Sequence, residues 1–205
     1  MIGIVDYGVG NLFSLESSFA ALGFETAVSG DPEVLRRCGH IVLPGVGAFR
    51  DAADKLRRTG LDAYIKEEAA AGKPLLGICL GMQLLFEKSY EYGEWEGLGL
   101  IPGAVRPIAD VIPAGLKIPH IGWNGLDFPA ERERCPLFKE LSPGDAVYFV
   151  HSYYAADCAP YVTATAEYGA DLTAAAARDN VMGTQFHPEK SGDVGLSILK
   201  AFCTL

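Results

Sequence analysis

The stretch Lys73-Pro-Leu-Leu-Gly-Ile-Cys79-Leu-Gly-Met-Gln-Leu-Leu-Phe86 decides the fold of this chain. Leu75, Leu76 and Ile78 form a short apolar run that is typical of a strand covered on both faces. The residues that follow Cys79 favour a helix. The pattern therefore predicts a buried strand, a sharp turn and a helix.

The turn itself carries a motif. Gly77-Ile-Cys79-Leu-Gly81 has the spacing of the G-x-S-x-G nucleophile elbow, with sulfur in place of oxygen. Glycines let the backbone crowd at such a turn, and the start of the next helix offers N–H groups and a positive dipole end that favour a thiolate and an oxyanion. The alternative is that Cys79 is a small core hydrophobe, as free cysteines often are. The elbow alone leaves both interpretations open.

Composition narrows the class of protein. At 205 residues we expect one domain, residues 1–205, and the 49% hydrophobic and 21% charged content is ordinary for a globular fold. A net charge of −9 without a basic run argues against nucleic acid and anionic membrane surfaces as partners. The five cysteines include no C-x-x-C pair, so they predict neither a disulfide framework nor a zinc site.

The start of the chain and its apolar runs indicate a compartment. Met1 is followed at once by a strand pattern, which leaves no room for a signal peptide. The longest apolar stretch is too short and too interrupted by Gly and Gln to span a bilayer. We expect a cytoplasmic, reducing setting, with no metal or other cofactor.

Strands and helices alternate through the first half. The expected strands are Ile2–Val5, Phe24–Val28, Ile41–Leu43 and the elbow strand, and the expected helices are Leu12–Leu22, a short one capped by Asp31, Ala48–Arg58 and Leu61–Ala71. Such alternation predicts an α/β fold with a mostly parallel, doubly wound sheet and helices on both faces. Gly8-x-Gly10 suggests a dinucleotide fingerprint, but Phe13 occupies the third glycine position, so we set that function aside.

The second half contains short strand-like pieces punctuated by Gly and Pro, whose close spacing predicts antiparallel hairpins. The expected strands are Leu98–Ile101, Val105–Ile108, Leu116–Ile121, Leu126–Phe128, Ala146–Val150, Tyr161–Tyr168, Leu172–Arg178 and Val181–Phe186. A brief helix is expected at Pro136–Leu141 and a final helix at Val194–Phe202.

One of the four histidines fits the base that a nucleophilic Cys79 needs. His187 ends an expected strand and continues as His187-Pro188-Glu189, and residues two apart in an extended segment point to the same side. Glu189 is thus placed to accept a hydrogen bond from the imidazole and to favour imidazolium. Because both motifs would lie at carboxyl ends of strands, we predict a Cys79–His187–Glu189 triad. Of the other histidines, His40 is expected to be structural, and His120 and His151 fit either role.

These motifs resemble those of the class I (triad) glutamine amidotransferases. The run Gly77–Gln83 resembles their nucleophile motif and Gln185–Lys190 their His–Glu motif. Four further motifs resemble a narrower family, the glutaminase subunits of imidazole glycerol phosphate synthases of histidine biosynthesis: Asp6–Leu12, Pro44–Phe49, Gly122–Asn124 and Tyr148–Tyr153. The resemblance runs from residue 6 to residue 190, with no departure at a catalytic position.

The resemblance implies a mechanism and a partner. Cys79 would attack the carboxamide of L-glutamine, His187 would transfer protons, and Glu189 would hold His187. The N–H groups of Leu80 and Val46 would meet the oxyanion. Ammonia would pass to a (βα)8-barrel cyclase subunit, forming a heterodimer with this chain. The implied glutamine-binding residues are Gly47, Gln83, Ser152 and Tyr153, and the implied partner-facing residues are Asn11, Pro119, Trp123, Asn124, Tyr148 and Lys190.

Four alternatives stay open at this point. Trp123 fits an ordinary core position as well as an interface anchor. The chain could be a glutaminase subunit for another acceptor, of the anthranilate or guanylate type. It could also be a non-catalytic regulatory subunit with the same fold, or a stand-alone thiol hydrolase. The last two differ in whether the chain hydrolyses glutamine without a partner.

Overall fold

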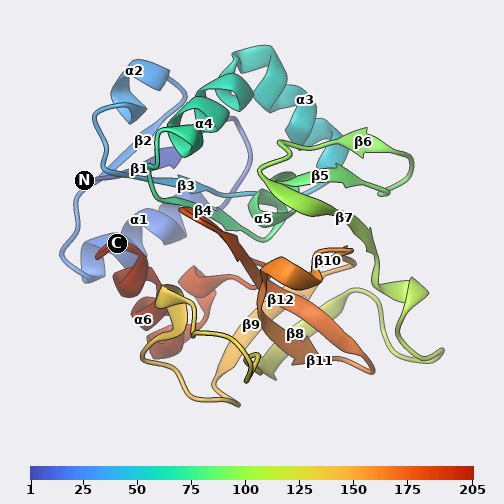
Figure 1. Cartoon of the computed structure of the whole chain (residues 1–205). Coiled ribbons are helices and arrows are strands. Elements are labelled where there is room, and N and C mark those ends of the chain that lie inside the picture. Colours follow the sequence, from blue (N-terminus) through green and yellow to red (C-terminus); the bar gives the residue numbers. More distant parts are fainter.

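The computed structural model describes residues 1–205, and a seven-stranded sheet forms its centre (Figure 1). The strand order is β11-β12-β13-β4-β3-β1-β2, which places the elbow strand β4 (Leu75–Ile78) in the middle. The strands β13 (Val181–Thr184), β4, β3 (His40–Leu43), β1 (Ile2–Val5) and β2 (Thr26–Ser29) run parallel to one another. The strand β12 (Asp171–Arg178) is antiparallel to both of its neighbours, β13 and β11 (Val162–Glu167). The expected fold class is confirmed.

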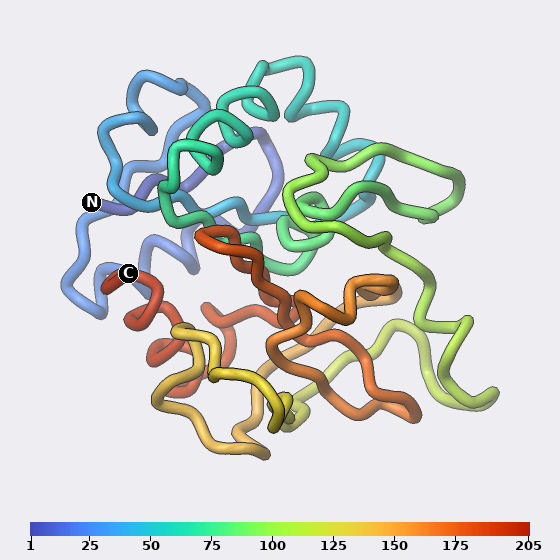
Figure 2. Tube along the Cα trace, in the orientation of Figure 1, coloured from blue at the N-terminus to red at the C-terminus, as the bar shows by residue number.

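Helices cover both faces of this sheet (Figure 1). The helices α3 (Phe49–Thr59) and α4 (Leu61–Ala70) pack in one hydrophobic cluster, together with Leu35 of α2 (Pro32–Leu35). The helices α1 (Leu12–Ala21) and α6 (Gly192–Phe202) contribute to the other cluster. Asp31 caps α2 as expected, since its side chain accepts a hydrogen bond from the Glu33 N–H at 2.9 Å. The tube in Figure 2 shows that the two chain ends lie on the same side of the molecule.

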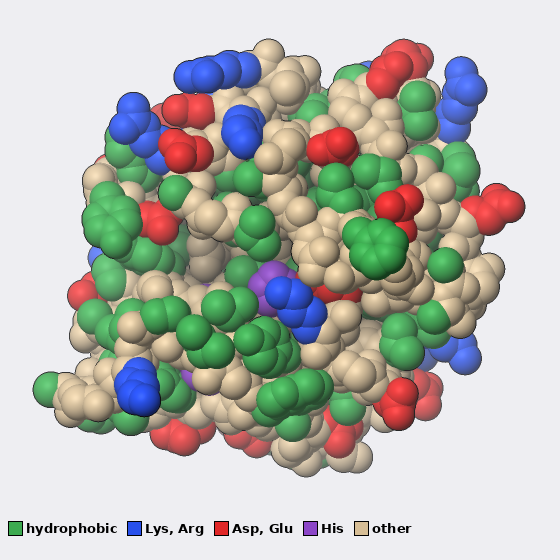
Figure 3. Space-filling model, turned by 180° about the vertical axis from the view of Figure 1, so that it is seen from behind, with side chains coloured by type: hydrophobic (Ala, Val, Ile, Leu, Met, Phe, Trp, Pro, Cys, Tyr) green, Lys and Arg blue, Asp and Glu red, His purple; other side chains and the backbone are tan.

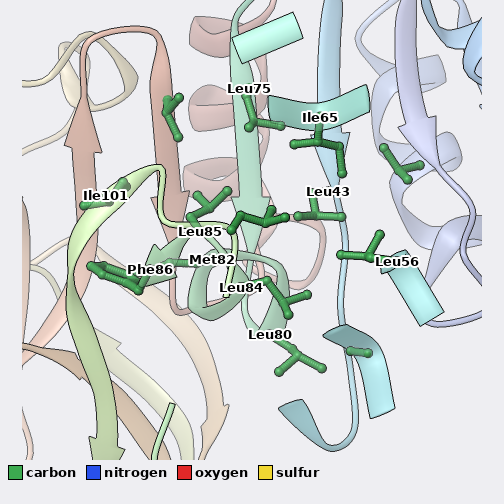
Figure 4. Packing of buried hydrophobic residues seen from close by; sticks show 14 of the residues in the cluster. Leu43, Leu56, Ile65, Leu75, Leu80, Met82, Leu84, Leu85, Phe86 and Ile101 are labelled. Carbon is green, nitrogen blue, oxygen red and sulfur yellow. The ribbon is translucent and has the colours of Figure 1, made fainter. Parts of the chain in front are cut away.

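The short helix α5 (Leu80–Leu84) anchors the elbow in the first cluster. Leu80, Met82 and Leu84 belong to the same cluster as Leu43 of β3, Leu56 of α3 and Ile65 of α4 (Figure 4). Each of the three α5 side chains is at most 3% exposed. Burying one such side chain contributes roughly 1.5–3 kcal/mol to stability. The packing of α5 therefore fixes the position of the turn that leads into it.

Two smaller sheets complete the chain. One has the order β10-β7-β5-β6, made of β10 (Tyr153–Ala156), β7 (Ile101–Pro107), β5 (Phe86–Ser89) and β6 (Trp95–Glu96). The other is an antiparallel ribbon of β8 (His120–Gly125) and β9 (Ala146–His151). Single 3-10 turns lie at Ile108–Asp110, Pro136–Phe138, Ala159–Tyr161 and Pro188–Lys190. None of the helices combines the length and the apolarity needed to cross a bilayer.

Some of the expected strand boundaries are wrong, and backbone hydrogen bonds explain why. The strand expected at Phe24–Val28 begins only at Thr26, because the Phe24 N–H still bonds the Phe19 carbonyl at 2.9 Å in the turn that closes α1. The pieces expected at Leu98–Ile101 and Val105–Ile108 are not two strands. The N–H of Leu98 bonds the Leu84 carbonyl at the end of α5, and one strand, β7, follows it.

Four further expectations in the second half are corrected. The strand expected at Leu116–Ile121 begins at His120, after an exposed loop, and Leu126–Phe128 forms only an isolated bridge between Asp127 and Thr165. The helix expected at Pro136–Leu141 is a single 3-10 turn, and the strand expected at Val181–Phe186 ends at Thr184. The strands β5, β6 and β10 were not expected from the sequence.

Candidate active site

Cys79 lies at the tip of a strained turn between β4 and α5. Its φ of 54° and ψ of −110° are unusual for a residue with a side chain, and such a conformation costs on the order of 1–3 kcal/mol. The two glycines of the motif make the turn possible. A Cβ at Gly77 would lie 2.7 Å from the Gly81 carbonyl oxygen, and a Cβ at Gly81 would collide with the Leu43 carbonyl. The spacing of the motif therefore has a steric cause.

Three neighbouring parallel strands position the residues of the site. Because β3, β4 and β13 are adjacent, their carboxyl ends meet at one edge of the sheet. The loop Pro44–Gly47 follows β3, Cys79 follows β4, and His187 comes three residues after β13. The Cys79 N–H donates to the Thr184 carbonyl at 2.7 Å, which extends the pairing of β4 and β13 to the cysteine itself. Open parallel sheets bind ligands at such an edge.

His187 and Glu189 form a buried pair. The imidazole Nδ1 lies 2.8 Å from the Glu189 Oε1, and the two side chains are 3% and 2% exposed. Burial lowers the pKa of His187, but interactions with Cys79 and then with Glu189 outweigh it and raise the pKa to about 9. The Nε2 has no hydrogen-bond partner of normal geometry. Because Nδ1 is held by the carboxylate, Nε2 is the atom available for proton transfer.

These groups open into a cavity of about 380 Å³, within the size range of small-molecule pockets. Its lining includes Cys79, His187 and both residues predicted for the oxyanion, Val46 and Leu80. Glu189 lies behind His187, outside the lining. The remaining lining residues are Gly47, Gln83, Glu91, Pro119, Val150, His151, Ser152, Tyr153 and Lys190. All four residues predicted to bind glutamine are therefore brought to the same cavity as Cys79.

Three residues at the site were not predicted from the sequence. The Tyr7 hydroxyl donates to the Pro44 carbonyl at 2.7 Å and so holds the base of the Pro44–Gly47 loop. The Glu91 carboxylate accepts the Phe49 N–H at the start of α3 and lines the cavity. Gln185, fully buried, contacts both Gln83 and the Cys79 sulfur. The family motifs contain Tyr7 and Gln185, but nothing in their spacing shows which atoms they contact.

The structure locates His120 and His151, the two histidines whose role the sequence left open. His151 lines the cavity, and its Nε2 lies 3.0 Å from the Nδ1 of His120. His120 stacks between Phe149 and Tyr168, with ring centroids 4.9 and 4.1 Å away. Burial lowers the pKa of His151 to about 4, so this ring is neutral near pH 7. No group of three or more His, Cys, Asp or Glu side chains is arranged to hold a metal ion.

An exposed apolar patch borders the cavity. On the outer face of the β8–β9 ribbon, Ile121 pairs with Val150 and Trp123 with Tyr148. Ile121 is 58% and Trp123 59% exposed, which rules out the core alternative for Trp123. On the face shown in Figure 3, hydrophobic side chains gather beside a histidine and a basic side chain near its centre. Since Val150 also lines the cavity, the patch and the cavity mouth are continuous.

The other residues predicted to face a partner lie in different settings. Pro119 and Lys190 are exposed and line the cavity. Asn11 is half-buried at the start of α1. The Asn124 amide donates to the Glu167 carbonyl at 2.6 Å and so ties β8 to β11. Within the chain Asn124 therefore has a structural contact that the sequence did not reveal.

Comparison with known proteins identifies the family. A family model described as "Glutamine amidotransferase class-I" matches residues 3–204, and the chain belongs to this family. The imidazole glycerol phosphate synthase subunit HisH of Syntrophotalea carbinolica is 50% identical over 206 residues, which cover 98% of each chain. The HisH subunit of Geobacillus thermodenitrificans is 51% identical over 205 residues, 98% of this chain and 94% of that one. Within the class I amidotransferases, the chain is thus a member of the HisH subunits.

Solved structures agree on the fold. A structure of PurLQS from Thermotoga maritima has a TM-score of 0.76 at 20% identity, over 99% of this chain and 97% of that one. A crystal structure of a glutamine amidotransferase has a TM-score of 0.75 at 19% identity and covers 98% of both chains. At this identity the likeness shows the fold alone.

Proposed function

We propose that the chain, acting as one domain, is a glutaminase that hydrolyses L-glutamine to glutamate and ammonia through a thioester on Cys79. The ammonia passes to a (βα)8-barrel cyclase subunit, which makes imidazole glycerol phosphate and an aminoimidazole carboxamide ribonucleotide in histidine biosynthesis. The observation that carries the proposal is the buried His187–Glu189 pair, of which His187 lines the same cavity as the elbow cysteine Cys79.

The triad performs the chemistry in two half-reactions. The Cys79 thiolate attacks the carboxamide carbon, and His187 gives its Nε2 proton to the nitrogen that leaves as ammonia. The product of this step is a glutamyl thioester. His187 then takes one proton from the water that attacks the thioester carbonyl, and the thiolate and imidazolium form again. The product leaves as the carboxylic acid and loses the second water proton to solvent to give glutamate. Glu189 holds the ring and stabilises its charged form throughout.

The oxyanion of both tetrahedral intermediates lies between two loops. Leu80 begins α5 directly after Cys79, and Val46 sits in the Pro44–Gly47 loop, with both residues lining the cavity. Their N–H groups are the proposed donors. Gln83 and the backbone around Gly47, Ser152 and Tyr153 hold the glutamine.

The apolar patch supports a partner at the cavity mouth. An exposed Trp123 packed edge to face on Tyr148, with ring centroids 6.1 Å apart, is suited to anchor an interface. A subunit docked there would cover the cavity and keep ammonia from water. The relatives that support this assignment are named as subunits of imidazole glycerol phosphate synthase. We place the heterodimer in the cytoplasm, a proposal supported by five free thiols, since reducing compartments keep cysteines reduced.

The alternatives are less well supported. A glutaminase for another acceptor is disfavoured because the relatives that match at about half identity are HisH subunits, whereas a structure described as a putative GMP synthase subunit matches at 20%. A non-catalytic subunit would have no use for a strained cysteine facing a buried His–Glu pair.

The test is glutamate release from glutamine by the chain alone and with the cyclase subunit. We expect little release alone and rapid release in the complex. Cys79→Ala should abolish glutamine-dependent synthesis in the complex but leave synthesis from ammonium intact, because the proposal places the acceptor substrate on the cyclase subunit. A chain that is fully active alone would be a stand-alone hydrolase, and one inactive in both assays would be a binding subunit.

A further inference from the structure

A line of hydrogen bonds runs from a backbone carbonyl to the Cys79 sulfur through two glutamines. The Gln83 Nε2 donates to the Tyr153 carbonyl at 3.2 Å and to the Gln185 Oε1 at 3.0 Å. The Gln185 Nε2 in turn lies 3.7 Å from the Cys79 sulfur, within hydrogen-bond range for sulfur. Gln185 is fully buried and Gln83 is 6% exposed.

The line permits only one orientation of each amide. The Tyr153 carbonyl can only accept, so Gln83 must turn its NH₂ group toward it. The second N–H of that group then requires an oxygen, which fixes the Oε1 of Gln185. The NH₂ group of Gln185 is left to face the sulfur. If the Gln185 amide were flipped, its NH₂ group would face the NH₂ group of Gln83, and its carbonyl oxygen would face the Cys79 thiolate.

A second set of hydrogen bonds holds the Tyr153 carbonyl, where this line of hydrogen bonds begins. The His151 Nδ1 lies 2.8 Å from the same Tyr153 carbonyl and must donate to it. Its Nε2 is then an acceptor, which the Nδ1 of His120 approaches at 3.0 Å. The Tyr153 carbonyl is therefore held from two sides, by a neutral histidine and by Gln83.

Two consequences follow at the cavity. An N–H donor reaches the sulfur from the side of the sheet, where it stabilises the thiolate more than the thiol. The Oε1 of Gln83 accepts no hydrogen bond from the protein, although Gln83 lines the cavity, so this oxygen is free to accept an N–H of a bound ligand.

We propose that Gln185 is a further catalytic residue, which donates a hydrogen bond to the Cys79 thiolate and holds Gln83 in the orientation that presents its oxygen to glutamine. The inference rests on the proposed glutaminase function of Cys79, but its test does not. The titratable groups around the sulfur and the cavity are Tyr7, Glu91, His151, Tyr153, His187, Glu189 and Lys190.

The experiment measures the alkylation rate of Cys79 by iodoacetamide as a function of pH, with peptide mapping to separate it from the other four cysteines. Because the thiolate is the reactive form, the midpoint of this profile reports how well the protein stabilises it. For Gln185→Met we expect the midpoint to rise by about one pH unit and the rate at a pH below the wild-type midpoint to fall about tenfold, the lower end for a hydrogen bond to a charged group. Gln185→Glu should give a larger rise, because a carboxylate then faces the sulfur.

Thr184→Val is the matched control. It removes a buried hydrogen bond of 3.1 Å from the Thr184 hydroxyl to the Phe186 carbonyl, while the backbone carbonyl of Thr184 that accepts the Cys79 N–H stays in place. It should melt earlier and keep the wild-type midpoint. If the folded Gln185 variants alkylate with the wild-type profile, the proposal is overturned.

If the Gln185 variants do not fold, Gln83→Met tests the same hydrogen bond from Gln185 to the Cys79 thiolate. It frees the Gln185 amide to turn, so a smaller rise of the midpoint in the same direction supports the proposal and an unchanged midpoint overturns it. Since no glutamine is used, a shifted profile in a chain that hydrolyses no glutamine would refute the proposed function and leave this role of Gln185 standing.

Discussion

Replacing Glu189 with glutamine removes one charge from the buried pair but leaves its hydrogen bond in place. An amide oxygen can accept the His187 Nδ1–H as the carboxylate does at 2.8 Å. The pKa of His187, however, lies at about 9 instead of 6.5, and Cys79 and Glu189 together provide this rise of about 2.5 (9 − 6.5) against desolvation. Loss of the Glu189 share should lower the pKa by on the order of one to two units.

The kinetic consequence has a definite direction. A raised pKa means that His187 keeps its proton up to about pH 9, so its loss limits the reaction only on the alkaline side. In the Gln variant the alkaline limb of the pH–rate profile should move to lower pH. Turnover near pH 8 should fall roughly two- to tenfold, because the protonated fraction of His187 drops from about 0.9 at a pKa of about 9 to about 0.5 or 0.1 after a loss of one or two units.

The assay is glutamate release by the assembled complex across the pH range, with a thermal melt to show that the variant is folded. His187→Ala is the companion variant and should lose more, because it removes the proton donor itself. A folded Gln variant with unchanged turnover and an unchanged alkaline limb would remove Glu189 from the triad.

Three further predictions concern the Pro44–Gly47 loop, the exposed apolar patch and His151. In the complex, Val46→Pro should lower glutamate release by roughly 10²–10³-fold by deleting one oxyanion donor, whereas Val46→Ala should change it little; near-normal release by the Pro variant would place the donor elsewhere. Trp123→Ala should weaken binding of the cyclase about tenfold or more in calorimetry with no loss of thermal stability, since this side chain is 59% exposed; unchanged affinity would move the interface off the patch. Because the pKa of His151 is about 4 in the fold and about 6.5 in the unfolded chain, the unfolded chain binds its proton first, and stability falls as pH drops from 6.5 to 4, by about 3 kcal/mol. Urea unfolding of His151→Gln should show a smaller loss over that window, and an equal loss would contradict the assignment.

The local motifs of the site were readable from the sequence because each has a local physical cause. Gly77 and Gly81 flank Cys79 because no larger residue fits the crowded turn. His187 and Glu189 pair because they are two residues apart in a constrained segment. The alternation of strands and helices then implies that both motifs reach one edge of a parallel sheet.

Other parts of the site depend on contacts between distant segments, and no local pattern reports them. Gln185 contacts a side chain 102 positions earlier in the chain, and Tyr7 holds a carbonyl 37 positions later. The exposure of Trp123 was left open because the strand expected here, Leu116–Ile121, ended before it, so the sequence assigned Trp123 to no face of a sheet. Only the register of β8 on β9 shows that Trp123 and Tyr148 share the outer face.

The most direct test of the proposed glutaminase is the mass of the chain during turnover. The complex is mixed with glutamine, quenched in acid within one turnover, and mapped by peptide mass spectrometry. We predict a glutamyl adduct on the peptide that carries Cys79, absent from Cys79→Ala. Steady hydrolysis of glutamine with no adduct on Cys79, or with the adduct on another residue, would contradict the assignment of Cys79 as the nucleophile.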